Sequence, residues 1–462
     1  MSNSEPVQKL KPAVDPKKLR EKYNMEDVLG NIPPMPVPKN LERKSGIISG
    51  NLHTWYEYVP SSYYKSDLAV PLLVSLHGGG NNGEGAAKAT TFTTIADREN
   101  FIILYPEATF SYEDEDGRHH EWNAFYMNNK SEDETYWLKL LIEKICNDYR
   151  IDRSRIYLTG HSNGDQMALQ LAVTYPELFA ACAGLNGPTH PDKIVDMAGN
   201  RMKPSIPLPY LRWNGERDPL GGGDLTRTQV NQLLNKYWIE INGCTTNPQF
   251  HLDGKLNTII YQSDCGAEVR FVEYKGGPHR LNIELASVVW YGFFCHFARG
   301  LDGSVIVLNR FDHPPSNIFT AALVDGSSHA MVKGNIIKLD PRKLTVAALT
   351  IEKCLYTPIH FIADIFGANV EWNQELCQAT LIYKEKNCQI TAEHPALWVD
   401  HKVFPFEVTP KMIEGSLWVP VQELAERFFE KKVSIAEGVV YISDWDTEIS
   451  NSIVHEIKKM IV

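Results

Sequence analysis

The sequence has 462 residues, too many for one hydrophobic core, so we expect two domains and a terminal extension. The formal net charge of -11 gives no basic surface for nucleic acid. No stretch approaches the roughly 20 apolar residues of a membrane span, so no membrane contact is expected. Eight cysteines are too sparse for a disulfide scaffold; Cys244 and Cys265 either pair across a loop or remain free thiols.

Residues 1–45 are predicted to form an N-terminal extension. Their beginning is polar and charged, and the proline-rich segment NIPPMPVPKN, residues 31–40, fits neither a helix nor a central strand. The segment lacks the apolar region of a secretory signal peptide. We therefore expect a cytoplasmic protein. A secreted or cell-surface location is the alternative if a signal has been removed.

Residues 46–301 alternate short apolar runs with helical patterns. This alternation predicts an α/β domain with a doubly wound, mostly parallel sheet and helices on both faces. The last helical pattern, residues 281–300, is expected to end at Gly300 and to close the domain. The predicted buried strands lie within residues 70–77, 101–108, 155–160, 179–187, 208–215 and 269–277.

Residues 302–462 have a different sequence pattern and contain an internal repeat, at about 330–390 and 397–443. The segment AMVKGNIIKLD, residues 330–340, resembles LWVDHKVFPFE, residues 397–407. A second pair of segments aligns Pro358, Ala363 and Phe366 with Pro420, Ala425 and Phe428, at a constant offset of 62. The pattern is a strand pair, a short helix and a strand, repeated. It predicts a separate, smaller α+β domain.

The segment RIYLTGHSNGD, residues 155–165, places Ser162 between Gly160 and Gly164 where a strand meets a helix. A Gly-x-Ser-x-Gly match is weak by itself, because a serine in an ordinary turn gives the same pattern. At a sharp strand-to-helix turn, however, bulky neighbours would clash, which explains both glycines. The helix N-terminus would also favour negative charge near the serine. We predict that Ser162 is a nucleophile.

A glycine-rich loop follows the first predicted buried strand, in LHGGGNNGEG, residues 76–85. Its glycines leave backbone N–H groups uncovered, and together with the N–H of Asn163 they can form an oxyanion hole. A phosphate-binding loop is the rival interpretation, but no Gly-Lys-Ser/Thr follows the glycines.

A serine nucleophile needs a base, and the base needs an acid that orients it. Asp218 follows a later strand and is the favoured acid, with Glu216 and Asp224 as rivals. His279 follows the last predicted strand and is the favoured base; His251 and His296 lie in less suitable contexts. The chain order Ser162, Asp218, His279 is the order of an α/β-hydrolase, and all three residues are expected at the carboxyl ends of strands.

These motifs, with WNGERDP (residues 213–219), resemble the polyhydroxybutyrate-depolymerase-like and feruloyl-esterase-like serine esterases. The resemblance implies a triad of Ser162, Asp218 and His279, and an oxyanion hole at the His77–Gly78–Gly79 turn and Asn163. Members of this group often carry a Trp-Asn pair near the pocket, matched here by Trp122 and Asn123. Trp122 would then either stack on an aromatic acyl or sugar group or belong to the core.

The second half is similar to the small repeat domain named after the N-terminal part of copper amine oxidases. Such domains usually occur in bacterial surface proteins. The resemblance implies either a binding module that contacts carbohydrate or the cell surface, or a packing or homodimerisation domain. It does not imply copper ligands.

The acidic stretch SYEDEDGRHHEW, residues 111–122, contains ligand-type side chains, but their spacing fits neither an EF-hand nor a His-Glu-x-x-His helix. We expect no cofactor and no metal. The sequence therefore predicts a serine esterase that acts on feruloyl or acetyl carbohydrate esters or on short hydroxyalkanoate polyesters. The alternatives are a peptidase or acyl-peptide hydrolase on the same fold, and a carbohydrate- or cell-wall-binding protein with a degenerate esterase domain.

Overall fold

The computed structural model describes residues 22, 24–30, 35–114, 117–124, 134–188, 200–221, 225–244, 247–308 and 319–462. The chain divides into two compact units. The first comprises residues 1–248 and 259–311, and the second comprises residues 249–258 and 312–462.

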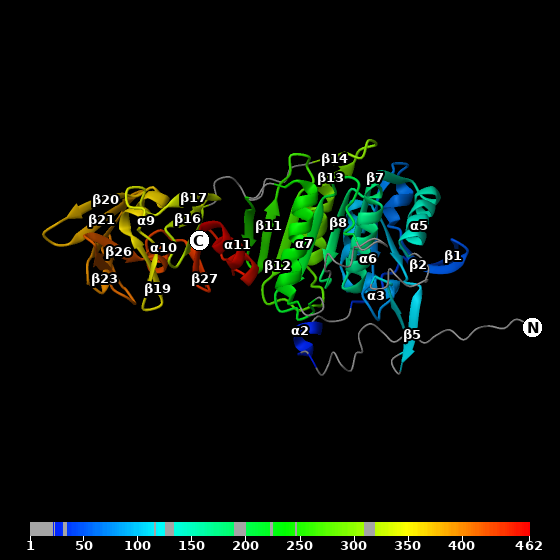
Figure 1. Ribbon diagram of the computed structural model, residues 1–462, viewed down its shortest axis with the longest axis horizontal. Coiled ribbons are helices and arrows are strands. Elements are labelled where there is room, and N and C mark those ends of the chain that lie inside the picture. Colours follow the sequence, from blue (N-terminus) through cyan, green and yellow to red (C-terminus); the bar gives the residue numbers. More distant parts are fainter. Residues whose placement is uncertain are drawn as a thin grey trace, which may run out of the picture. The chain divides into compact units, whose positions relative to one another are not determined.

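The first unit alternates strands and helices along the chain (Figure 1). Its elements are α2 (Met25–Leu29), β1 (Leu41–Ile48), β2 (Asn51–Tyr58), β3 (Val70–Leu76), α3 (Gly83–Ala89), α4 (Phe92–Glu99), β4 (Ile102–Pro106), β5 (Phe110–Asp114), β6 (Gly117–Glu121), α5 (Glu134–Asp148), β7 (Ile151–His161), α6 (Asn163–Thr174), β8 (Ala181–Leu185), β9 (Tyr210–Gly215), α7 (Arg227–Asn242), β12 (Val269–Tyr274), α8 (Leu285–Gly292), β13 (Phe297–Arg299) and β14 (Val305–Val307). Strands β10 (Gln249–Asp253) and β11 (Leu256–Tyr261) follow α7 in the chain, and their residues 249–258 are assigned to the second unit.

The main sheet has ten strands in the order β1-β2-β4-β3-β7-β8-β9-β12-β11-β10. Strands β4, β3, β7, β8, β9 and β12 pair in parallel, whereas β1 and β2 form an antiparallel hairpin at one edge. Helices α5, α6 and α7 cover one face, and α4 and α8, which pack against each other, cover the other. The predicted doubly wound α/β-hydrolase sheet is confirmed.

The central strands are rich in apolar residues, although β9 also carries the buried polar residues Arg212 and Asn214. All seven residues of β3 and all six of β9 are buried, as parallel strands are when helices cover both faces of the sheet. Two parts of the sequence behave differently from the simplest expectation. Strand β1 begins at Leu41, within the segment assigned to the extension. The helix predicted up to Gly300 is wrong, because α8 ends at Gly292.

The early end of α8 has a local cause. Phe293 leaves the helical conformation, with φ -142° and ψ -69°, and a short 3₁₀ turn and strand β13 follow. The run Phe293–Phe297 is rich in aromatic residues, which fit a strand as well as a helix, so its hydrophobic pattern could not distinguish the two.

The second unit contains short strands and three helices among its described residues. They are β15 (Thr320–Val324), β16 (His329–Val332), β17 (Asn335–Lys338), β18 (Leu349–Ile351), β19 (Cys354–Pro358), α9 (Ile359–Phe366), β20 (Asn369–Asn373), β21 (Gln378–Tyr383), β22 (Lys386–Thr391), β23 (Ala396–Val399), β24 (Lys402–Pro405), β25 (Lys411–Ile413), β26 (Ser416–Pro420), α10 (Val421–Arg427), β27 (Lys432–Ala436), β28 (Val439–Ser443) and α11 (Asn451–Ile461).

The internal repeat appears as two five-stranded sheets of matching order, β17-β16-β15-β28-β27 and β24-β23-β22-β21-β20. Strands β19 and β26 pair with each other in a third, four-stranded sheet. Pro358 and Pro420, the residues aligned in the sequence, directly precede α9 and α10. A proline is tolerated there because the beginning of a helix needs no backbone donor.

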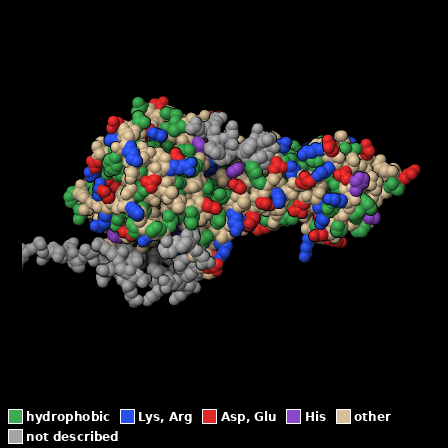
Figure 2. Space-filling view, turned by 180° about the vertical axis from the view of Figure 1, so that it is seen from behind, with side chains coloured by type: hydrophobic (Ala, Val, Ile, Leu, Met, Phe, Trp, Pro, Cys, Tyr) green, Lys and Arg blue, Asp and Glu red, His purple; other side chains and the backbone are tan. Residues whose placement is uncertain are grey.

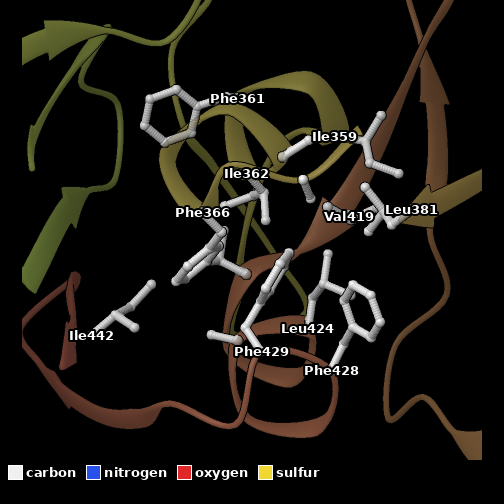
Figure 3. Packing of buried hydrophobic residues seen from close by; sticks show 14 of the residues in the cluster. Ile359, Phe361, Ile362, Phe366, Leu381, Val419, Leu424, Phe428, Phe429 and Ile442 are labelled. Carbon is white, nitrogen blue, oxygen red and sulfur yellow. The ribbon is translucent and has the colours of Figure 1, made fainter. Parts of the chain in front are cut away.

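Helices α9 and α10 bury their apolar faces in the core of the second unit (Figure 3). Phe366 stacks on Phe429 with 4.0 Å between ring centroids, and Leu381 from β21 and Ile442 from β28 complete the cluster. Aromatic pairs of this kind add to the stabilisation that burial provides.

The described surface mixes both signs of charge, and basic and acidic side chains are interspersed on the face shown in Figure 2. Within the described ranges, no helix is long and apolar enough to cross a membrane. All eight cysteines are free, so Cys244 and Cys265 do not pair in this structure.

The core of the second unit supplies a matched pair of leucines for a stability test. Leu381→Ala should lower the free energy of unfolding of this unit by about 2–5 kcal/mol, because it removes a fully buried side chain and leaves a cavity. Leu376→Ala, at a residue that is 58% exposed, should have little effect. Hydrogen exchange of peptides from residues 319–462 in increasing urea measures both changes. Equal losses would contradict the core assignment.

Candidate active site

Ser162 lies at a sharp turn between β7 and α6. Its backbone has φ 55° and ψ -115°, a strained conformation for a residue with a side chain. The Ser162 N–H donates to the carbonyl of Leu185 on β8 at 2.9 Å, and its own carbonyl accepts the N–H of Asp165 at 3.1 Å. The turn is therefore fixed by the neighbouring strand on one side and by the first turn of α6 on the other.

The two glycines around Ser162 are required by close backbone packing. A Cβ atom at Gly160 would lie 2.2 Å from the carbonyl oxygen of Gly164, and one at Gly164 would lie 2.3 Å from the carbonyl oxygen of His77. No side chain fits at such distances. The two glycines are therefore needed because the backbone at Gly160 contacts that at Gly164, and the backbone at Gly164 contacts that at the end of β3.

Asp218 and His279 form a buried pair at the ends of adjacent parallel strands, β9 and β12. The distance between His279 Nδ1 and Asp218 Oδ2 is 2.8 Å, and the two residues are 7% and 3% exposed. A carboxylate at Nδ1 orients the imidazole and leaves Nε2 for other partners. Of the rival acids, Glu216 pairs with Lys275 at 2.9 Å, and Asp224 lies outside the described residues.

Three groups hold the Asp218 carboxylate. Besides His279, the Leu220 N–H donates to Oδ1 at 2.9 Å, and the guanidinium of buried Arg227 donates to Oδ2. Burial works to raise the pKa of Asp218, but the charges of His279 and Arg227 and these hydrogen bonds keep that pKa below its ordinary value. Asp218 is therefore ionised near neutral pH.

The backbone of His279 is fixed as well as its ring. Its carbonyl accepts Nδ2–H of Asn186 at 2.5 Å and lies 3.1 Å from His161 Nε2. The rings of His161 and His279 have centroids 5.0 Å apart. Because His161 immediately precedes Ser162, these contacts bring the strand-to-helix turn next to the Asp218–His279 pair.

His77 organises the glycine-rich loop from beneath. Its Nε2 accepts the N–H of Ala108 at 3.1 Å, so the ring proton must be on Nδ1, which donates to the Gly78 carbonyl at 2.8 Å. Burial lowers the pKa of His77 to about 3, which keeps the ring neutral. The Gly78 carbonyl is thereby tied down, and in a trans peptide the N–H of Gly79 points the opposite way.

The glycine-rich loop lies against the turn at Ser162. A Cβ atom at Gly78 would be 3.6 Å from Ser162 Cβ, and one at Gly79 would be 3.4 Å from Asn163 Cβ. In the part of the chain that the structure describes, the backbone N–H groups of Gly79 and Asn163 have no hydrogen-bond partner. Two unused donors beside a serine are suited to binding an oxyanion.

Trp122 is buried and holds the loop in place. It is 1% exposed, and its indole N–H donates to the His77 carbonyl at 2.9 Å. Its backbone N–H also donates to Asn163 Oδ1 at 2.6 Å, and its carbonyl accepts Asn163 Nδ2–H at 3.2 Å. Of the two interpretations of Trp122, the structure favours a core residue that fixes His77 and Asn163 over a ring that stacks on substrate.

The acidic stretch before Trp122 falls partly outside the described residues, which exclude Asp116 and the side chains of Asp114 and His119. His120 lies 3.0 Å, through Nδ1, from the Ala108 carbonyl. Among the residues that the structure describes, no group of three or more His, Cys, Asp or Glu side chains is placed to hold a metal ion.

Sequence reasoning missed Asn186, Arg227 and the contact of His161 with His279. Asn186 follows the apolar strand β8 with φ 53°, and an asparagine at such a strand end was the one available signal. Arg227 begins α7, after the loop that follows Asp218. Nothing in its local sequence indicates that it returns to that carboxylate.

Two parts of the chain match known protein families. Residues 57–192 match the esterase PHB depolymerase family, and residues 329–442 match the copper amine oxidase N-terminal domain. A bifunctional acetylxylan esterase/xylanase from Neocallimastix patriciarum is 25% identical over 201 residues, which are 44% of this chain and 25% of the relative.

Other relatives carry related names. Poly(3-hydroxyalkanoate) depolymerase C from Paucimonas lemoignei is 26% identical, over 39% of this chain and 40% of the relative. Feruloyl esterase B from Neurospora crassa is 28% identical, over 29% of this chain and 44% of the relative. The chain thus spans less than half the length of each of these relatives.

Among solved structures, an acetyl xylan esterase from Aspergillus awamori aligns with 55% of this chain and 99% of its own, at 19% identity and a TM-score of 0.41. The chain is accordingly similar to the PHB-depolymerase esterases over residues 57–192 and to the copper amine oxidase N-terminal domain over residues 329–442.

Proposed function

We propose that this protein is a serine carboxylic ester hydrolase that works through an acyl-enzyme, with Ser162, Asp218 and His279 as its triad. The observation that carries the proposal is the buried Asp218–His279 pair: the ring and the carbonyl of His279 contact His161, the residue before the strained turn at Ser162. The matching esterase family and the esterase relatives support the same class of reaction.

In the proposed acylation, the Ser162 hydroxyl attacks the ester carbonyl while His279 Nε2 takes its proton. A tetrahedral intermediate forms, and its negative oxygen is bound by the N–H groups of Gly79 and Asn163. His279 then gives the proton to the alcohol oxygen, the carbon–oxygen bond breaks, and the alcohol leaves. Asp218 stays ionised throughout and stabilises the imidazolium.

Deacylation repeats these steps with water. His279 removes a proton from water, the resulting hydroxide attacks the acyl-enzyme carbonyl, and the same two N–H groups bind the oxyanion. When the intermediate collapses, His279 returns the proton to Ser162 and the carboxylic acid is released.

The proposed substrates are acetyl or feruloyl esters of carbohydrate, or short hydroxyalkanoate esters. Relatives named acetylxylan esterase, feruloyl esterase and poly(3-hydroxyalkanoate) depolymerase support this range. We further propose that residues 46–301 form the catalytic part, and that residues 302–462 provide a binding or homodimerisation module.

The nucleophile can be tested directly. Ser162→Ala should lower kcat/KM for p-nitrophenyl acetate and methyl ferulate by at least about a thousandfold, because it removes the oxygen that forms the acyl-enzyme in the proposed mechanism. Wild type should also be labelled covalently by a fluorophosphonate, and Ser162→Ala should not be.

Ser61→Ala is the matched control, since Ser61 is exposed at the start of a surface 3₁₀ turn and should leave both readouts unchanged. Wild-type rates in pure Ser162→Ala protein would refute the mechanism. Absence of activity on every ester in wild type would instead favour a peptide substrate or a binding protein.

Arg227 is proposed as a positioning residue for the triad acid. It binds Asp218 Oδ2, the oxygen that also faces His279, and donates through Nη1 to the Gly187 carbonyl at 2.6 Å and through Nη2 to the Asn186 carbonyl at 3.2 Å. Burial lowers the pKa of Arg227 to about 10, which still leaves it charged at neutral pH. One side chain thus connects the acid to the segment that also holds the His279 carbonyl.

Arg227→Met should lower kcat by roughly 10- to 100-fold with a smaller change in KM, as expected for a misplaced acid. The sign of the pH effect follows from Asp218. Arg227 helps to keep the pKa of Asp218 low, so removing Arg227 raises that pKa. The acid limb of the pH profile of kcat should therefore shift to higher pH. A pH series of kcat measures the shift.

Arg227→Lys should restore part of the profile, because it keeps a cation in place. Arg299→Met is the matched control: Arg299 is also buried and binds the carbonyls of Phe179, Pro207 and Gly303, none of them in the site. If Arg227→Met and Arg299→Met lose activity to the same extent, and neither shifts the acid limb of the pH profile of kcat, a positioning role for Arg227 is excluded.

A further inference from the structure

The two five-stranded sheets of the second unit share their strand order but differ in what covers them. In each sheet, one face enters the common core: Ala330 on β16 and Leu397 on β23 occupy corresponding positions there, and both are fully buried. Their neighbours Met331 and Trp398 point to the opposite faces. Met331 is 2% exposed, whereas Trp398 is 47% exposed.

Helix α11 explains the difference at the first sheet. It packs on β15 and β16, and the face beneath it is apolar and buried, including Ala322, Met331 and Tyr441. On the second sheet, Asn387, Gln389 and Trp398 on the corresponding face are exposed, as far as the structure describes the chain. The outer face of the first sheet is therefore buried by α11, whereas Trp398 on the outer face of the second sheet is exposed.

The exposed face, which we call the Trp398 face, has a composition of its own. Strand pairing places one row of residues across all five strands: Glu371, Thr380, Gln389, Trp398 and Val403. Flanking positions on the same face carry the polar residues Gln378, Thr391 and Asn387 and the apolar residues Ile382 and Ala396, and Gln378 Nε2–H donates to Thr391 Oγ1 at 2.9 Å. In the five strands, only Glu371, on the edge strand β20, brings a charge to this face.

We propose that the Trp398 face is a binding site for a neutral polysaccharide. Trp398 offers a flat aromatic surface for a sugar ring, with the apolar side chain of Val403 beside it. The amides and hydroxyls around Trp398 both donate and accept hydrogen bonds, which matches the hydroxyl groups of a sugar. Strands lie about 4.8 Å apart, so the row extends over roughly 20 Å, enough for several linked sugars.

The same features disfavour other partners. A nucleic acid or another polyanion would need Lys or Arg on the face, and the strands place none there. An amphipathic helix would bury the amides of Gln389 and Asn387 against apolar atoms, which is costly. The face that α11 covers is apolar, with Ala322 and Met331, whereas the Trp398 face carries polar residues such as Thr380 and Gln389 at its centre.

This inference does not depend on the proposed esterase activity, because sugar binding is measured without hydrolysis. The test uses the full chain in native gels that contain soluble arabinoxylan, with parallel gels of β-glucan, mannan and no polysaccharide. Wild type and Ser162→Ala should both be retarded by at least one polysaccharide. Trp398→Ala should weaken the retardation by roughly tenfold or more in apparent affinity.

Trp372→Ala is the matched control. Trp372 is 40% exposed on edge strand β20, but it pairs with Ala379 and so belongs to the other face of the sheet. It should bind like wild type. Gln389→Ala, also on the Trp398 face, should weaken binding without changing the melting temperature, which separates recognition from folding.

Three outcomes would overturn the proposal. The first is a wild type that none of the polysaccharides retards. The second is unchanged retardation of Trp398→Ala, which would locate the sugar elsewhere, such as the esterase site. The third is a wild-type dimer in light scattering that Trp398→Ala dissociates, which would make the face an interface between copies.

Discussion

The first unit depends on one backbone constraint, the close passage of the Ser162 turn against the end of β3. Gly160 and Gly164 allow contacts that no Cβ atom would permit, and Gly164 packs directly on the carbonyl of His77. The serine and the glycine-rich loop are consequently not two separate features. Each is held in position by the backbone of the other, so the strain at Ser162 is supported on both sides.

The second constraint is the crowding of polar groups behind the site. Asn186 accepts a hydrogen bond from the Gly215 N–H and donates one to the His279 carbonyl. The Gly187 carbonyl accepts hydrogen bonds from Arg212 and Arg227, and the Gly187 N–H donates to Asp165. All of these residues are buried. A buried network of this kind is stable only when its members are satisfied together. It connects the ends of β8, β9 and β12, and thereby fixes the acid and base by the sheet itself.

Much of this arrangement could be predicted from sequence because its causes are local. Continuous apolar runs mark strands covered on both faces, and glycines at Gly160 and Gly164 mark a turn without space for side chains. The constant offset between Pro358 and Pro420 marks the repeat. Arg227 and Trp122 could not be assigned in this way. Their contacts depend on loop paths that bring distant segments together, and an aromatic run such as Phe293–Phe297 suits either a helix or a strand.

The strand order of the second unit makes the folding of its two repeats interdependent. Each five-stranded sheet takes strands from both repeats: β15 pairs with β28, so Thr320 lies beside Ser443 at the far end of the module, while β20 and β21 join β22, β23 and β24. Neither repeat can complete a sheet from its own strands. Although its sequence is repeated, the module is one cooperative folding unit with many non-local contacts, and such topologies fold slowly. A cut between the repeats would leave unpaired strand edges on both fragments, which are prone to aggregate.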